Sequence, residues 1–259
     1  PTKKSSYNIA MVCDFFYPRM GGVENHIYSL SQHLIRCGHK VIIVTHSYNN
    51  NDTSSTDHTK NRRRVGVRYL PGPLKVYYCP FSVMTDQDIV PTITVTFPLW
   101  RHIMIREQIH IVHCHQATSV MTNESIVYAA AMGIPSVYTD HSLFQLDDIA
   151  GVVLNRVLET TLSQVSAIIC VSHACRDNLI LRAKLWQTNT NNKNKINNHS
   201  NRRPIIKVIP NAVDSSKFTP IISNKTSTTT TLFPPLQQLY DQDNENSINK
   251  NTTTTSQQR

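Results

Sequence analysis

The chain has 259 residues, room for one large domain or two small ones, and a net charge of +9 from 26 basic and 17 acidic side chains. No apolar run reaches the ~20 residues that cross a bilayer, and six cysteines without a CxxC pair fit a reducing compartment. The basic clusters lie in polar loops and are most often simply solvated. As a binding surface they fit an anionic membrane better than nucleic acid, because no zinc-finger spacing or aromatic-interleaved basic stripe accompanies them.

The first elements predicted along the chain form a βαβ unit. The apolar run at 7–13 predicts a strand, and apolar residues then recur at helical spacing from Val23 to Leu34. Gly38 is placed to end this helix, and the β-branched run at 40–45 predicts the next strand. Two strands joined by a crossover helix must be parallel.

Apolar strands and amphipathic helices continue to alternate along the chain. This pattern predicts a doubly wound, Rossmann-like α/β sheet. Further strands are predicted at 65–70, 75–78, 110–114, 135–139, 166–171 and 205–210, and helices at 97–108, 119–132, 151–163 and 172–185.

Two stretches lack the apolar residues that a packed core needs. The insert at 187–203 and the tail at 221–259 are rich in Asn, Thr, Ser and Gln. Their burial cannot offset the entropy of ordering them, so we predict disorder in both. The folded domain is predicted to span 7–220.

The ligand crevice of a doubly wound sheet lies beyond the carboxyl ends of its strands, and polar residues follow each predicted strand there. Gly21 and Gly22 follow the first strand and precede a helix N-terminus, where free amides favour an anion. A tight turn that needs positive φ would explain the pair equally well. The glycines match neither the dinucleotide G-x-G-x-x-G pattern nor a P-loop, which disfavours a dehydrogenase or an ATPase.

Four stretches carry a family resemblance. "MVCDFFYPRMGGVENHIYSL", "YTDHSLF", "IICVSHACRDN" and "VIPNAVD" resemble the amino-terminal half of retaining glycosyltransferases with two Rossmann-like domains, the GT-B fold. The first two stretches, with "GVRYLPGPLKVYY", narrow the resemblance to the catalytic subunits of phosphatidylinositol N-acetylglucosaminyltransferase in glycosyltransferase family 4.

The resemblance implies transfer of N-acetylglucosamine from UDP-N-acetylglucosamine (UDP-GlcNAc) to phosphatidylinositol, the first step of glycosylphosphatidylinositol (GPI) anchor synthesis. It further implies a multi-subunit complex on the cytosolic face of the endoplasmic reticulum membrane. In that family the amino-terminal domain holds the acceptor, and a carboxy-terminal domain, which we expect to be absent from this chain, holds most of the donor. We therefore expect the chain alone to be inactive. The alternatives are a non-catalytic binding or scaffold module of the same fold, and a transferase with another acceptor.

The resemblance also implies roles for individual residues. His141 matches the active-site histidine beside the transferred sugar, although a lone histidine at a strand end is ordinarily structural. His113 and His115 share a strand face, but without a carboxylate or third ligand nearby we expect no metal and no cofactor besides the donor. Asp140 and His141 should point to opposite faces of their strand. The expected substrate contacts are Gly21, Gly22, Glu24, His115, Asp140, Ser142, Ser172 and Asn211.

Overall fold

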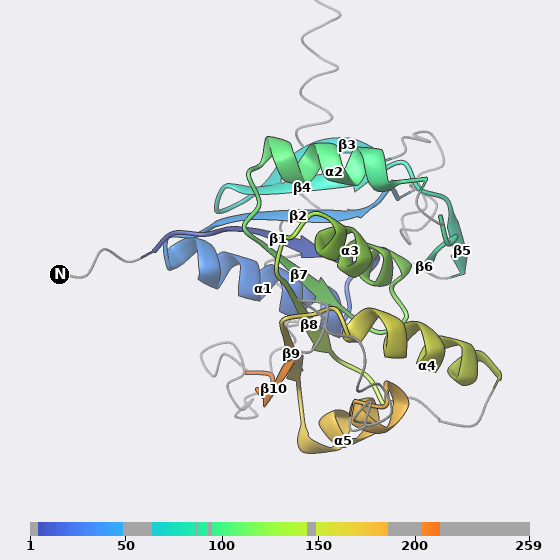
Figure 1. The fold of residues 1–259 in the computed structure, drawn as a ribbon. Coiled ribbons are helices and arrows are strands. Elements are labelled where there is room, and N and C mark those ends of the chain that lie inside the picture. Colours follow the sequence, from blue (N-terminus) through green and yellow to red (C-terminus); the bar gives the residue numbers. More distant parts are fainter. Residues whose placement is uncertain are drawn as a thin grey trace, which may run out of the picture.

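The computed structural model describes residues 5–48, 64–85, 88–92, 95–143, 149–185 and 204–212 (Figure 1). The predicted disordered insert at 187–203 and tail at 221–259 lie outside the described residues, as does the end of the predicted domain at 213–220.

The described residues form helices and strands close to the predicted ranges. The strands are β1 (Asn8–Val12), β2 (Lys40–His46), β3 (Gly66–Leu70), β4 (Leu74–Cys79), β5 (Val83–Thr85), β6 (Asp88–Ile89), β7 (Ile111–His115), β8 (Ser136–Asp140), β9 (Ala167–Cys170) and β10 (Ile205–Val208). The helices are α1 (Gly22–Arg36), α2 (Phe97–Arg106), α3 (Val120–Ala131), α4 (Ile149–Leu162) and α5 (His173–Arg182).

Eight strands form one sheet in the order β10-β9-β8-β7-β1-β2-β4-β3. Every neighbouring pair is parallel except β3–β4, which is antiparallel. If only the parallel strands are numbered, in chain order, β4-β2-β1-β7-β8-β9 has the order 3-2-1-4-5-6 of the Rossmann fold. Strand β10 extends the sheet at the edge beside β9. The order reverses beside β1, which pairs with β2 on one side and β7 on the other. The predicted doubly wound α/β sheet is therefore confirmed.

Helices cover both faces of the sheet (Figure 1). Alternate residues of β1 enter different cores, because successive side chains of a strand point to opposite faces. Ile9 and Met11 pack with Ile27 of α1, whereas Ala10 and Val12 belong to the core that includes side chains of α2, α3, α4 and α5. Among the described helices, α1 therefore covers the face that carries the odd-numbered side chains of β1, and the other four cover the opposite face.

Asp14 connects the loop after β1 to the start of α3. Its carboxylate accepts hydrogen bonds from the backbone amides of Val120 at 2.9 Å and Met121 at 3.3 Å, in the first turn of that helix. The hydroxyl of Ser119, the N-cap of α3, accepts from the backbone amide of Asp14 at 3.0 Å. Burial, and then the charge of nearby Asp88, raises the pKa of Asp14 well above its usual value. These contacts fix the loop that leads to Gly21.

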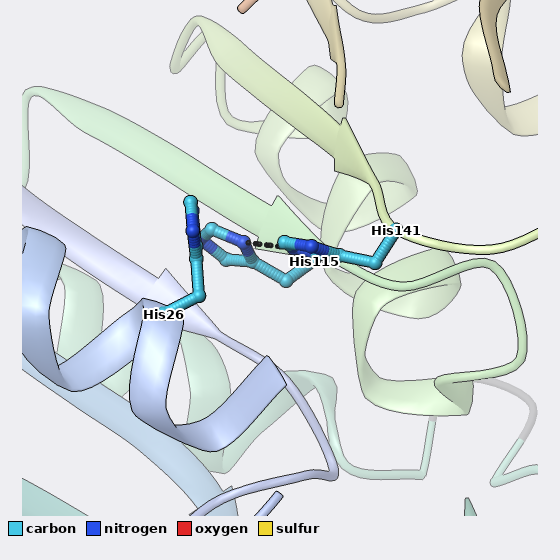
Figure 2. A group of neighbouring side chains, drawn as sticks. All are labelled: His26, His115 and His141. Atoms are coloured by element: carbon cyan, nitrogen blue, oxygen red, sulfur yellow. Dashed lines mark hydrogen bonds between the residues drawn. The ribbon is translucent and has the colours of Figure 1, made fainter. Parts of the chain in front are cut away.

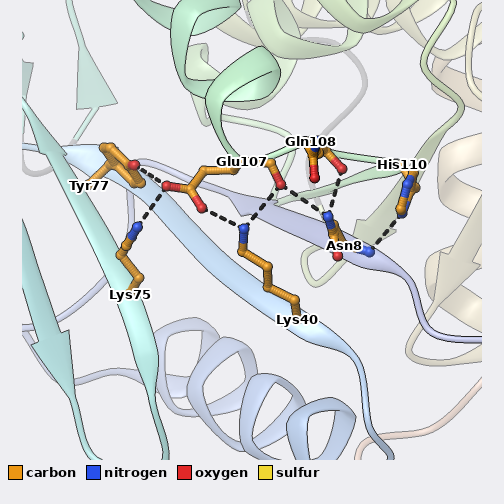
Figure 3. Close-up of polar contacts among 7 residues, drawn as sticks. All are labelled: Asn8, Lys40, Lys75, Tyr77, Glu107, Gln108 and His110. Atoms are coloured by element: carbon orange, nitrogen blue, oxygen red, sulfur yellow. Dashed lines mark hydrogen bonds and ion pairs between the residues drawn. The ribbon is translucent and has the colours of Figure 1, made fainter.

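The amino edge of the sheet holds a charged group that we call the carboxylate cluster, made of Glu107, Lys40, Lys75 and Tyr77 (Figure 3). Glu107 follows α2, and its carboxylate contacts Lys40 Nζ at 2.8 Å and Lys75 Nζ at 2.7 Å and also accepts from the Tyr77 hydroxyl. Hydrogen bonds from Lys40, Lys75 and Tyr77 lower the pKa of Glu107 to about 2, although its burial acts in the opposite direction. The cluster joins α2 to β2 and β4.

Within the described ranges, no helix has the length and apolar character needed to cross a bilayer. All six cysteines are free thiols, and five of them are buried. A buried free thiol packs as a small apolar side chain.

Candidate active site

Four polar side chains converge at the carboxyl edge of the sheet, beside the point where the strand order reverses. His26 projects from α1 toward His115 at the end of β7 and His141 just after β8 (Figure 2). Asn211, which follows β10, hydrogen bonds to the His26 side chain. Segments separated by up to 185 positions in the sequence thus meet at one place, as expected for the ligand crevice of a doubly wound sheet.

We call His26, His113, His115 and His141 the imidazole cluster. A hydrogen bond of 3.2 Å joins His115 Nδ1 to His141 Nε2, and the two rings are stacked with centroids 5.5 Å apart. The His26 ring meets the His141 ring edge-on at 4.8 Å. The His113 ring stacks on the His115 ring at a centroid distance of 4.2 Å and hydrogen bonds through Nε2 to Thr139 Oγ1 at 2.7 Å.

The imidazole cluster is electrically neutral near pH 7. Burial, and to a smaller extent the nearby imidazoles, lowers the pKa of His141 to about 4 and that of His113 to about 3. The pKa of His115 lies well below its usual value for the same reasons. Burial also lowers the pKa of His26, against the opposing effect of its hydrogen bond to Asn211. These side chains therefore offer hydrogen bonds to a ligand rather than positive charge.

The two glycines before α1 have different constraints. Neither has a positive φ, so the tight-turn explanation is wrong for both. A Cβ on Gly21 would lie 2.5 Å from Glu24 Oε2, whereas a Cβ on Gly22 would meet nothing within 4 Å. Gly21 therefore accommodates the buried Glu24 carboxylate, while no contact within the described chain requires glycine at position 22. The N-cap of α1 is Gly21, which has no side chain of its own to compete with an anion for the first-turn amides.

The other expected contact residues divide into two groups. Ser142 lies beside the imidazole cluster, where its Oγ accepts from Gln116 Nε2 at 2.8 Å. Asp140 is turned to the opposite face of β8 and is fully buried, with its carboxylate bonded to the Tyr138 hydroxyl at 3.0 Å. Ser172 is the N-cap of α5 and accepts from the Cys175 amide at 3.1 Å. The structure thus gives Asp140 and Ser172 structural partners and does not bring them to the imidazole cluster.

Three of the imidazoles could together hold a metal ion, since ligand atoms of His26, His115 and His141 lie within 4.8 Å of one another. We expected no metal from the sequence because His113 and His115 lack a third ligand nearby in the chain. That reason is wrong, because helix α1 and the end of β8 supply two more imidazoles.

His26 is the member of the cluster that is not among the residues predicted from the sequence. It lies one helical turn after Gly22, and residues four apart share a face of a helix. A polar side chain on the same face as an anion-binding helix N-terminus was the available signal. The direction of that face, however, depends on how α1 packs on the sheet.

Comparisons with known proteins agree on one family. A family model described as PIGA (GPI anchor biosynthesis) matches residues 58–148. The chain is 44% identical over 214 residues to the phosphatidylinositol N-acetylglucosaminyltransferase GPI3 subunit of Saccharomyces cerevisiae, covering 83% of this chain and 41% of the relative. It is 44% identical over 215 residues to a phosphatidylinositol N-acetylglucosaminyltransferase subunit of Homo sapiens, covering 83% of this chain and 38% of the relative. The chain therefore spans about two-fifths of the length of these relatives.

Solved structures with detectable similarity have much lower sequence identity. Anabaena HepE in complex with UDP and glucose is 15% identical, with a TM-score of 0.47 over 82% of this chain and 46% of that chain. Sucrose-phosphate synthase from Thermosynechococcus elongatus is 14% identical, with a TM-score of 0.48 over 83% of this chain and 50% of that chain. By its sequence, over most of its own length, the chain is a relative of the phosphatidylinositol N-acetylglucosaminyltransferase subunits and carries a match to the PIGA family.

Proposed function

We propose that this chain is part of a retaining glycosyltransferase subunit that transfers N-acetylglucosamine from UDP-GlcNAc to phosphatidylinositol, the first step of GPI-anchor synthesis. The names of the relatives support the reaction, and one structural observation supports the site. That observation is the convergence of His141, His115, His26 and Asn211 beside the uncapped N-terminus of α1. The convergence lies where a Rossmann-like sheet binds its ligand.

Each part of this arrangement has a role in the proposed transfer. His141 faces the transferred sugar as a neutral imidazole and offers it a hydrogen bond. The first-turn amides of α1 face the donor diphosphate, which gains negative charge as the bond to the sugar breaks. Because Gly22 has no Cβ, a phosphate can approach the backbone closely. We assign most contacts to the uridine to a part of the enzyme outside this chain.

We propose that the transfer needs no metal ion. The imidazole cluster supplies no carboxylate, and the two nitrogens of His115 and His141 that lie nearest each other are already joined by a hydrogen bond. The amide dipoles of α1 supply part of the electrostatic stabilisation that a cation would otherwise give to the leaving diphosphate. Turnover that survives removal of divalent ions by a chelator is the expected result.

We place the enzyme on the cytosolic face of the endoplasmic reticulum membrane, as one subunit of a complex. The relatives are named as subunits, and six free thiols suit a reducing compartment. The net charge of +9 favours contact with anionic lipid headgroups rather than neutral ones. The chain should therefore bind phosphatidylinositol-containing vesicles weakly. Binding should decrease as salt is added, because salt screens charges over ~8–10 Å. Equal binding to neutral and anionic vesicles would contradict this contact.

The decisive experiment measures transfer of labelled N-acetylglucosamine to phosphatidylinositol by the intact enzyme complex. His141→Ala should lower turnover about 10²–10³-fold, the usual effect of removing one preorganised group that stabilises a transition state. His33→Ala, an exposed change on α1, is the matched control and should leave turnover unchanged. The 259-residue chain alone should give no labelled lipid. Full turnover by the His141→Ala complex would rule out the proposed site.

A further inference from the structure

His115 holds a central position that its expected role as a substrate contact does not explain. Its side chain is fully buried and stacks with the rings of both His113 and His141. One ring nitrogen, Nδ1, is hydrogen bonded to His141 Nε2. The other, Nε2, is buried and has no hydrogen-bond partner among the described residues.

The unpartnered nitrogen decides where the proton of His115 resides. Burial keeps this imidazole neutral, so it carries a single N–H. Nε2 lacks a partner in either tautomer, but a proton there would make it a buried, unpartnered N–H donor, which is rarer in proteins than an unpartnered acceptor. A proton on Nδ1 is instead donated to His141 at 3.2 Å. The favoured tautomer of His115 is therefore the one protonated at Nδ1.

The tautomer of His115 then sets that of its neighbour. His141 Nε2 must accept the hydrogen bond from His115 and is therefore unprotonated. His141 is also neutral, so its single proton resides on Nδ1. That N–H makes no hydrogen bond within the described part of the chain, and the residue is only partly buried.

We propose that His115 is a positioning residue, which fixes the ring and tautomer of His141 so that its Nδ1–H donates to an oxygen of the transferred sugar. This assignment rests on the proposed function, because that function supplies the sugar. It gives His141 a defined chemistry, in which the side chain is a hydrogen-bond donor to the sugar and does not act as a base toward it.

The strand pairing keeps His115 in place. In the register of β7 with β8, His115 lies opposite Thr139, whose hydroxyl is hydrogen bonded to His113 at 2.7 Å. The His113 ring is thereby held against the face of His115, at a centroid distance of 4.2 Å. A row of three contacts, from Thr139 through His113 and His115 to His141, therefore limits rotation of the imidazole that faces the sugar.

Two substitutions of His115 separate positioning from simple packing. The amide nitrogen of asparagine occupies nearly the place of Nδ1, so His115→Asn keeps a donor for His141. The longer His115→Gln places its amide near the position of Nε2 and loses that donor. We expect His115→Gln to lower kcat about 10- to 100-fold with little change in KM, the range typical of a lost partner that orients a functional imidazole. His115→Asn should recover most of the wild-type kcat.

The tautomers are read directly from side-chain nitrogen resonances of the 259-residue chain labelled with ¹⁵N-histidine. The expected spectrum has His141 protonated at Nδ1 and unprotonated at Nε2, with a mixture of tautomers in His115→Gln. His33→Gln, an exposed change on α1 outside the imidazole cluster, should leave the His141 pattern unchanged. A wild-type His141 protonated at Nε2 would overturn the proposal, whatever the variants do.

Kinetics of the intact complex distinguish failure of this inference from failure of the proposed function. If His141→Ala abolishes transfer while His115→Gln retains full kcat, positioning by His115 is wrong and the proposed site stands. If His115→Asn and His115→Gln lose kcat equally, His115 acts through packing and the inference also fails. If His141→Ala retains full transfer, the proposed site itself is wrong.

Discussion

The two edges of the central sheet differ in whether their buried polar side chains have hydrogen-bond or ion-pair partners. At the amino edge, the carboxylate of Glu107 is bonded to two lysines and a tyrosine. At the carboxyl edge, the imidazole cluster contains four neutral rings, and His115 Nε2 has no partner in the described structure. Because a buried polar group without a partner lowers stability, native proteins keep few of them, and those few call for an explanation.

This difference indicates that the amino edge stabilises the fold and that the carboxyl edge binds a ligand. The carboxylate cluster satisfies its own charges and ties α2 to the strands. The imidazole cluster leaves hydrogen-bonding capacity unused, as expected of a surface that a substrate completes. Changes at the amino edge should therefore affect unfolding, whereas changes at the carboxyl edge should affect transfer.

The largest expected effect on stability comes from Glu107→Ala. Its side chain is only 4% exposed, and its loss leaves Lys75 Nζ and the Tyr77 hydroxyl without their main partner. We expect the free energy of unfolding to fall by about 1–3 kcal/mol, measured by urea denaturation. The matched control is Glu159→Ala, which removes more exposed ion pairs with Arg156 and Lys184 and should cost less than about 1 kcal/mol. An equal fall in unfolding free energy for the two variants would show that the carboxylate cluster stabilises the fold no more than an exposed ion pair does.

The second prediction concerns the loss of the stabilising contribution of Glu107 at low pH. The folded-state pKa of Glu107 is about 2, below its usual value of 4.5, so its contribution to stability is fully present above pH 4.5. That contribution should be lost as the pH falls from 4.5 toward 2. Glu107→Gln should flatten this part of the plot of unfolding free energy against pH. A variant with the wild-type slope would show that other carboxylates cause the acid sensitivity.

The smallest expected effect on folding belongs to Gly22→Ala. A Cβ there has no neighbour within 4 Å, so the change should stabilise helix α1 slightly, by about 0.4–1 kcal/mol. The same methyl group should obstruct the donor diphosphate and raise the KM for UDP-GlcNAc in the intact complex. Gly21→Ala is the internal comparison, since its Cβ would displace the carboxylate end of Glu24 and should therefore stabilise the helix less than Gly22→Ala does. An unchanged KM in Gly22→Ala would argue against phosphate at this turn.

Most of the fold could be predicted because its strands are apolar runs separated by helices of clear periodicity. The antiparallel pair β5–β6 could not be predicted, because its strands have only three and two residues and show no measurable period. Helix α5 ends at Arg182 rather than at the predicted Leu185. A stretch of residues 183–185 with helix-forming composition does not reveal where the last helical bond lies.

The candidate site was predictable only in part. Strand ends could be read from the sequence, which correctly placed His115, His141 and Asn211 at one edge of the sheet. Whether the His26 side chain faces the site depends on the rotation of α1 about its axis. That rotation is set by packing against β1 and β2. The alternation along β8 already indicated that Asp140 and His141 diverge, and the structure places Asp140 against Tyr138 as this rule requires.

The position of β1 in the middle of the sheet has a consequence for synthesis of the protein. Its two neighbours are β2, complete at residue 46, and β7, complete at residue 115, so 69 further residues must be made before both edges of β1 are paired. At ribosomal rates of about 5–20 residues per second, this interval lasts roughly 3–14 s. An open apolar strand edge is a template for pairing with other chains. The nascent chain is therefore most exposed to misassembly while residues 47–115 emerge, and slow translation through this stretch would lengthen that exposure.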